Sequence, residues 1–170
     1  MGKPHLINRD YRTSHNTVHT LYHLIRFKQA CGIDLSTIKH IVEWGGGYGN
    51  MARIFAKINP SSTYILIDNS FMACLQWLYL SSVLKDTSRI HLITGPDEEI
   101  KTGKITIIPL GLLSYYTLKT DLFISTWAIS ESPVIAQKIV IDHQWFNALH
   151  ILLAYQKKSK DFPDSEYVIP

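Results

Sequence analysis

The chain has 170 residues, of which 46% are hydrophobic and 18% are charged, and its formal net charge is +3. This length suits one domain with its own core and excludes two domains of ordinary size. Apart from Lys157, Lys158 and Lys160, the basic residues are scattered, so they do not form the basic stripe that a nucleic-acid backbone requires.

The chain shows no feature that predicts secretion or membrane insertion. Its first residues, Met-Gly-Lys-Pro-His, do not resemble a signal peptide, and no stretch approaches the roughly 18 consecutive apolar residues of a membrane-spanning helix. Cys31 and Cys74 lie in apolar, helix-like stretches, so we expect reduced thiols in the core. We therefore predict a cytoplasmic protein that binds neither membranes nor nucleic acid.

The first half of the chain alternates helical and strand-like patterns of apolar residues. In chain order, the expected elements are a helix at 16–30, a strand at 38–43, a helix that stops at Asn59-Pro60, a strand at 63–67 and a helix at 70–84. The helix at 70–84 is apolar nearly all round, which predicts that it is buried.

The second half continues the alternation. Strands are expected at 89–93, 104–108 and 121–126, then a helix from Ser132-Pro133 to about Leu149, and a last strand at 151–155. Strands and helices that alternate at this spacing predict a Rossmann-like α/β fold, with a mostly parallel sheet and helices on both faces. We expect one domain over 1–170, with its core at about 16–156.

A glycine-rich turn joins the first predicted strand to the next helix. It reads Glu43-Trp44-Gly45-Gly46-Gly47-Tyr48-Gly49-Asn50. Glycines in this context let a ligand approach the main-chain N–H groups closely, although a merely tight turn is the alternative. A dinucleotide fingerprint, G-x-G-x-x-G, would need a third glycine where Asn50 stands. The turn instead fits E-x-G-x-G-x-G, which resembles motif I of methyltransferases that use S-adenosylmethionine (SAM).

A carboxylate at the end of the second strand supports a nucleoside site. Asp68 follows Gly49 by nineteen residues. At the carboxyl end of a strand, such a side chain can accept both ribose hydroxyls. This geometry serves SAM and NAD alike, so Asp68 predicts a nucleoside without choosing between the two.

Three segments resemble a bacterial family of sugar O-methyltransferases, which belongs to the class I SAM-dependent methyltransferases. They are 42–50 with its GGGYG core, 64–68 with the helix that ends at 77–82, and 121–131, and the resemblance covers about 16–156. It implies SAM as cofactor and a sugar-type small-molecule acceptor. It places the cofactor against Glu43, Gly45, Gly46, Gly47, Tyr48, Gly49, Asp68, Asn69, Ser125, Thr126 and Trp127.

The sequence departs from the family in three ways. Asn69-Ser70-Phe71 stands where the family has Leu-Pro-Glu, Ser125 replaces an asparagine, and only about fifteen residues follow the last predicted strand. Because family members continue with further strands, we expect a truncated core, with a partner or second copy covering the open sheet edge. An inactive SAM-binding or interaction module is therefore the alternative to an active O-methyltransferase, and an NAD-dependent enzyme is a third, weaker one.

Two residues are candidates for the base that takes the acceptor proton. Glu131 follows the predicted strand at 121–126, although an acidic residue at a helix start is also stabilised by the helix dipole. His143 has suitable chemistry but falls inside a predicted helix, where a structural role is the alternative.

Histidines recur every fourth residue in the first predicted helix. His15, His19 and His23 share one face, a spacing at which neighbouring pairs can bind zinc. Arg26 shares that face and no cysteine or acidic ligand completes a set, so we predict a polar helix face and no metal. This helix precedes the first strand and can cover the SAM site, with Asn16 or His19 near the cofactor.

Overall fold

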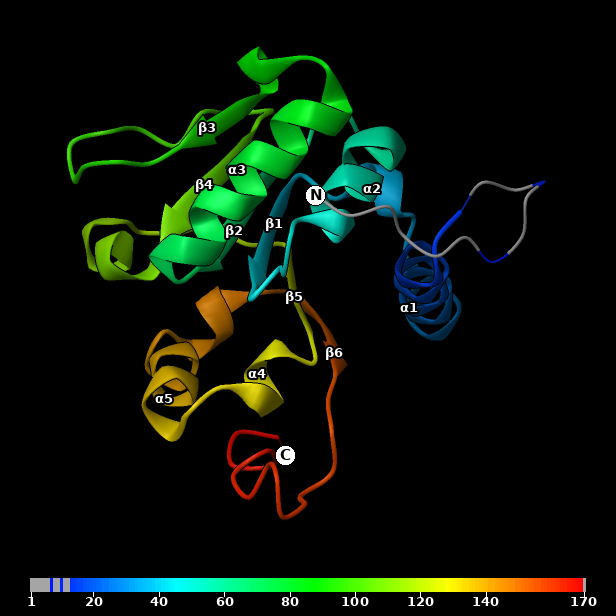
Figure 1. Cartoon of the computed structure of the whole chain (residues 1–170), viewed down its shortest axis with the longest axis vertical. Coiled ribbons are helices and arrows are strands. Elements are labelled where there is room, and N and C mark those ends of the chain that lie inside the picture. The colour runs from blue at the N-terminus through cyan, green and yellow to red at the C-terminus, as the bar shows by residue number, and fades with distance from the viewer. Residues whose placement is uncertain (1–6, 8–9, 11–12, 170) are drawn as a thin grey trace.

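The computed structural model of the protein describes residues 13–169 together with residues 7 and 10 (Figure 1). Within them, six strands form one sheet in the order β3-β4-β2-β1-β5-β6, and every neighbouring pair is parallel. The strands are β1 (His40–Trp44), β2 (Thr63–Asp68), β3 (Ile90–Leu92), β4 (Ile105–Pro109), β5 (Leu122–Thr126) and β6 (His150–Ala154). The α-helices are α1 (His15–Cys31), α2 (Asn50–Ile58), α3 (Ser70–Leu84), α4 (Ala128–Glu131) and α5 (Val134–Asp142).

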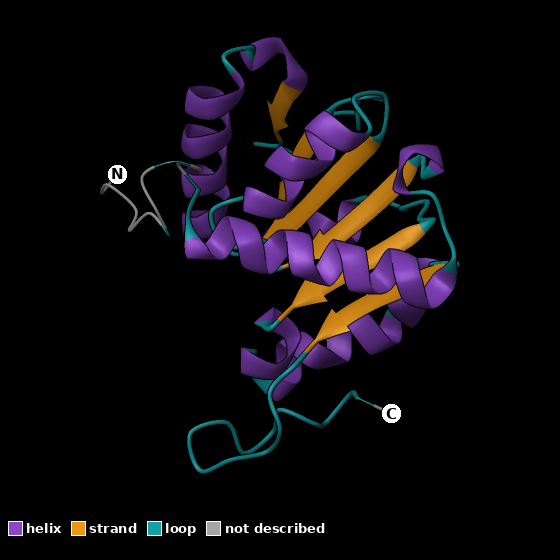
Figure 2. Cartoon of the chain, turned by 90° about the vertical axis from the view of Figure 1, so that its right-hand side faces the viewer, coloured by secondary structure: helices purple, strands orange, loops and turns teal. Residues whose placement is uncertain are grey.

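Helices cover both faces of the sheet, as Figure 2 shows, and each face has its own apolar core. On one face, Leu24 of α1, Phe55 of α2 and Leu80 of α3 pack against the strands. On the other, Ile129 of α4 and Val140 of α5 do so. A parallel sheet is buried on both faces, which explains why its central strands are continuously apolar. The predicted Rossmann-like α/β fold is confirmed.

The strand order reverses at β1. From β1 the chain moves to β2 on one side, and later returns to place β5 on the other side. In open α/β sheets the loops that leave two such strands diverge and open a crevice at their carboxyl ends. The sequence of connections therefore fixes where a ligand site can form.

The predicted strands all occur, but the C-terminal end predicted for one helix is wrong. The helix expected from Ser132 to about Leu149 is α5, which begins after its N-cap Pro133 and ends at Asp142. Residues 144–147 follow with backbone φ angles between 51° and 55°, a left-handed conformation that a right-handed helix cannot contain. The short helix α4 was not anticipated.

The helix α3 is less buried than its composition predicts. Only Ala73, Gln76 and Leu80 are buried, whereas Phe71 is 77% exposed and Leu78 is 52% exposed. The buried residues recur at helical spacing, so α3 rests on the sheet by one narrow stripe. The prediction of core thiols is wrong too, because Cys31 and Cys74 are free and exposed.

Two further observations concern the edges and surface of the fold. Among the described residues β6 is an edge strand, so a partner or second copy that covers this edge stays a prediction. None of the described helices combines the length and the apolar character needed to cross a membrane.

Asp121 joins the entry of β5 to β1. Its Oδ2 atom accepts hydrogen bonds from the backbone N–H groups of Lys39 (3.0 Å) and His40 (2.9 Å). Burial alone would raise the pKa of Asp121, but these amide donors and the His40 side chain outweigh it and lower the pKa below its ordinary value. The carboxylate thus helps to set the register of the strand pair that borders the crevice.

We expect the substitution Asp121→Ala to lower the free energy of unfolding by about 2 kcal/mol at pH 7, because two backbone donors lose a charged acceptor. Since the folded-state pKa is depressed, this stabilisation is present above the ordinary aspartate pKa of about 3.9 and disappears as the pH falls through the lower folded value. Urea unfolding at several pH values measures the difference. Asp161→Ala, at an exposed position, is the control, and equal losses for both variants would contradict the prediction.

Candidate functional site

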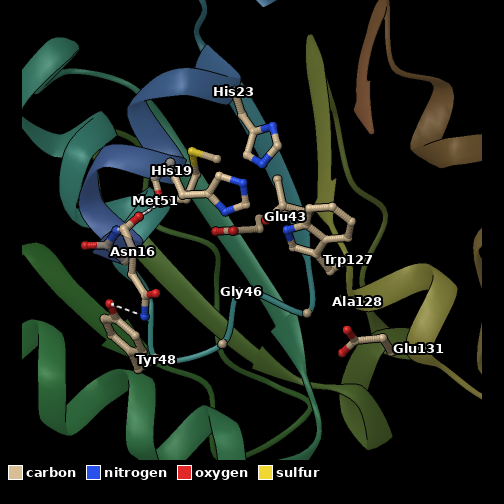
Figure 3. Close-up of a pocket in the computed structure, with 15 residues that line it drawn as sticks. Asn16, His19, His23, Glu43, Gly46, Tyr48, Met51, Trp127, Ala128 and Glu131 are labelled. Carbon is tan, nitrogen blue, oxygen red and sulfur yellow. Dashed lines mark hydrogen bonds between the residues drawn. The ribbon is translucent and has the colours of Figure 1, made fainter. Parts of the chain in front are cut away.

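An open cavity of about 360 Å³ lies where the carboxyl ends of β1 and β5 face helix α1 (Figure 3). Its wall comes from four places in the sequence: α1, the glycine-rich turn with the start of α2, the end of β1, and the segment after β5. The lining residues are Asn16, His19, Thr20, His23, Glu43, Gly45, Gly46, Gly47, Tyr48, Asn50, Met51, Thr126, Trp127, Ala128 and Glu131. The cavity therefore occupies the crevice that the reversal of strand order opens.

The glycine-rich turn forms one wall because its conformation excludes side chains. Gly45, Gly47 and Gly49 have φ angles of 68°, 55° and 95°, which favour glycine. A Cβ atom on Gly46 would lie 2.4 Å from Leu66 Cδ2. The backbone of the turn is thus exposed to the cavity at Gly45, Gly46 and Gly47, whereas Gly49 packs against Leu80 and lies outside the lining.

Glu43 brings a carboxyl group to the cavity from inside the sheet. Its residue is only 2% exposed, and the Tyr64 hydroxyl donates a 2.7 Å hydrogen bond to its Oε2 atom. Burial raises the pKa of Glu43 to about 7; the Tyr64 hydrogen bond opposes this rise and the Asp68 charge adds to it. Near neutral pH this group can therefore gain or lose a proton in response to a ligand charge.

Gln76 links the turn to Asp68, and sequence reasoning missed it. Its buried Nε2 group donates to the carbonyl oxygen of Gly47 and to Asp68 Oδ2, both at 2.9 Å. The only sequence signal was an amide within an otherwise apolar helix. Asp68 ends β2 and Asn69 follows it, as predicted, but neither is among the residues that line the cavity. Asn69 caps α3 by accepting a hydrogen bond from the Met72 N–H group.

Helix α1 covers the turn through a polar network. Asn50 Nδ2 donates to Thr20 Oγ1 at 3.0 Å and to the Asn16 carbonyl at 3.4 Å, and Asn16 Nδ2 donates to the Tyr48 hydroxyl at 3.4 Å. The structure places Asn16 and His19 in the lining, beside the predicted cofactor residues. The contributions of Thr20 and Asn50 depend on how α1 packs and carried no sequence signal.

The segment after β5 supplies the opposite wall. Thr126 and Trp127 line the cavity, whereas the buried Ser125 accepts a 3.1 Å hydrogen bond from the Ile129 N–H group instead. Trp127 has a φ angle of 71°, uncommon for a bulky residue, and its N–H group donates to the Ala154 carbonyl at 2.6 Å. This backbone conformation holds the indole ring beside α1.

The two candidate bases lie in different places. Glu131 lines the cavity, and its Oε1 atom accepts a 2.6 Å hydrogen bond from Gln156 Nε2. His143 lines a separate hollow with Ser114 and Asp142, and its Nδ1 atom is 2.8 Å from the Ile139 carbonyl oxygen. The structure thus brings Glu131, but not His143, to the predicted cofactor residues.

Across residues 13–169, no three histidine, cysteine or acidic side chains are grouped so that they could hold a metal ion. His15 is exposed on α1 and is not part of the cavity lining, unlike His19 and His23.

Comparison with known proteins identifies the fold. No protein-family model and no curated protein matches the chain by sequence. The structure is similar to that of the mitomycin 7-O-methyltransferase, with a TM-score of 0.52 and 11% identity over 91% of this chain and 44% of that one. It is also similar to a coclaurine N-methyltransferase bound to N-methylheliamine and S-adenosylhomocysteine (SAH), with a TM-score of 0.50 and 12% identity over 100% of this chain and 47% of that one.

These likenesses show that the chain has the Rossmann-like fold of SAM-dependent methyltransferases. The chain spans less than half the length of either solved structure. The likeness concerns the arrangement of strands and helices, and the chemistry of this chain has to follow from its own residues.

The turn offers a matched pair of substitutions. Gly45→Ala and Gly47→Ala both place an alanine at positive φ, but only the new Cβ at residue 45 would collide, 2.2 Å from Ala128 Cβ. We expect Gly47→Ala to cost about 1 kcal/mol of stability through backbone strain, and Gly45→Ala to cost roughly 1–3 kcal/mol more. Chemical denaturation of the two variants measures the difference. Equal losses would contradict the close contact between the turn and α4.

The raised pKa of Glu43 predicts an effect of pH on stability. The folded protein holds the proton more tightly than the unfolded chain, so stability should fall as the pH rises from about 4.5 to about 7. The loss at pH 8 relative to pH 4 is about 3 kcal/mol, at 1.36 kcal/mol per pKa unit. Glu43→Gln cannot ionise and should lack this component. Denaturation of both proteins at pH 4 and pH 8 tests it, and parallel pH profiles would count against a buried titrating carboxyl.

Proposed function

We propose that the cavity binds SAM and that the chain is a methyltransferase domain, transferring a methyl group to a hydroxyl of a sugar or similar small molecule. The observation that carries this proposal is the charge of the cavity. Two carboxyl-bearing residues, Glu43 and Glu131, line it, and no lysine or arginine is among the described residues of its lining. SAM carries a sulfonium, an ammonium and a carboxylate group and is a net cation, whereas the pyrophosphate of NAD makes that cofactor a net anion.

The residues fit this cofactor in chemical type. Glu43 would attract the positively charged end of the ligand, and the exposed backbone of Gly45, Gly46 and Gly47 permits close approach. Asp68, held by Gln76, is suited to accept hydrogen bonds from ribose hydroxyls. When bound, SAM supplies an activated methyl group. The chain's own contribution is to position the donor and acceptor and to remove the hydroxyl proton.

The nature of the acceptor is inferred from chemistry and from resemblance. Because no lysine or arginine is among the described residues of the lining, the phosphate of a phosphorylated acceptor would meet Glu43 and Glu131 without a fixed counter-charge, which disfavours such an acceptor. A neutral, hydroxyl-rich molecule fits, and the sugar O-methyltransferase resemblance points to a sugar. A SAM-binding module without turnover is the second candidate, since the chain spans less than half of the solved methyltransferases.

Calorimetric titration with SAM, SAH and NAD tests the cofactor. We expect binding of SAM and SAH but not of NAD, and about tenfold or greater weakening in Asp68→Ala, which loses the ribose acceptor. Asp161→Ala, on the exposed C-terminal segment, is the control. A folded chain that binds none of the three ligands would refute the proposal.

Turnover separates the two candidate functions. Release of SAH in the presence of neutral methyl glycosides would support the methyltransferase, whereas tight SAH binding without release from any sugar would favour the binding module. The phosphorylated forms of the same sugars serve as the matched set, and preference for them would contradict the inferred neutral acceptor.

A further inference from the structure

Two imidazole rings of α1 face the cavity opposite the turn, as Figure 3 shows. The ring centroids of His19 and His23 are 4.6 Å apart. The Trp127 indole lies against both, stacked with His19 at 5.9 Å and edge-on to His23 at 6.1 Å. The strained backbone of Trp127 thus supports a cluster that brings two histidines, one turn apart on α1, to the cavity.

The Nε2 atom of His23 is buried and has no hydrogen-bond partner among the described residues. A buried nitrogen in this state is costly, and unpaired groups of this kind are found where a ligand supplies the partner. Burial, and next the neighbouring His19, lower the pKa of His23 below its ordinary value, so the ring is neutral at pH 7. A neutral imidazole is the form that can take up a proton.

The groups that face His23 suit a proton acceptor. His19 and Tyr22 flank it on α1, the Trp127 ring lies edge-on to it, and Glu43 and Glu131 line the same cavity. A carboxylate in that cavity would favour a positive imidazolium. Glu131 itself is exposed and already accepts a hydrogen bond from Gln156, so it is less suited to be the base.

We propose that His23 Nε2 takes the proton of the acceptor hydroxyl, while the ring of Trp127 positions it; this proposal rests on the proposed function. The exposed His19 ring, which packs against His23, would turn aside to admit the hydroxyl. As the new oxygen–carbon bond forms, the carbon–sulfur bond breaks and its electron pair stays on sulfur. The positive charge moves from sulfur to the imidazole of His23, which then releases its proton to water.

A comparison of two ligands tests whether His23 lies beside the reacting groups. Sinefungin resembles SAH but carries an ammonium group where SAM carries its methyl-sulfonium, so it would donate a hydrogen bond to His23 Nε2. We expect His23→Phe, which keeps an aromatic ring, to bind SAH within roughly twofold of the affinity of the unmodified chain. The ratio of its sinefungin affinity to its SAH affinity should be about tenfold lower than in the unmodified chain. His15→Phe, on the same helix but outside the lining, should keep both.

A spectroscopic readout accompanies the titrations. The pKa of His23, followed by NMR of ¹⁵N-labelled histidine and assigned with the variant, should fall when sinefungin replaces SAH, because a nearby cation opposes protonation. With the methyl glycosides, His23→Phe should lower kcat by about 100-fold or more, whereas His15→Phe should match the unmodified chain.

The outcomes are distinguishable. Failure of SAH to bind the unmodified chain overturns the proposed function, and this inference with it. Retained SAH binding with an unchanged sinefungin preference in His23→Phe overturns only the role of His23. The role of His23 is also overturned if His19→Phe loses the preference for sinefungin and His23→Phe keeps it. Full turnover by His23→Phe would overturn that role as well.

Discussion

In a parallel sheet every strand delivers its carboxyl end to the same edge, and the position of a ligand site then depends on where the strand order reverses. Here the reversal falls between β1 and β5. Asp121 ties the beginnings of these two strands, and the divergence of their far ends leaves a cavity between the glycine-rich turn and Trp127. Helix α1 then closes the third side by bonding to Asn50.

The electrostatic character of the cavity follows from one buried group. Glu43 lies within the central strand, where the Tyr64 hydroxyl donates a hydrogen bond to it, and neither lysine nor arginine is among the described residues that line the cavity beside it. Burial of a carboxylate without a fixed counter-charge is unfavourable, so this group keeps its proton to a higher pH than usual. A cationic ligand would supply the missing counter-charge. The binding free energy of such a ligand would therefore include the free energy that burial of the Glu43 carboxylate costs the free protein.

The sequence alone predicted the parts of the candidate site that depend on local chain geometry. The glycine-rich turn, Asp68 and the segment 125–127 all lie at or just after the ends of strands, and strands are recognisable from short apolar runs. The parts supplied by packing were missed. Gln76 and His23 lie on helices whose orientation decides what they face, and the exposure of Phe71 on α3 could not be read from an apolar sequence. His143 fell inside an expected helix because nothing in residues 144–147 signals a left-handed backbone.

The side-chain amide of Gln76 connects the glycine-rich turn to the end of β2. Because one NH₂ group bonds both the Gly47 carbonyl and Asp68, the turn and the strand end are held at a fixed separation before any ligand arrives. A ligand that contacts both elements would meet an ordered frame, so the protein would lose less conformational entropy on binding it. The same bridge couples the two elements energetically, so substitutions in the turn and at Asp68 should have non-additive effects on stability.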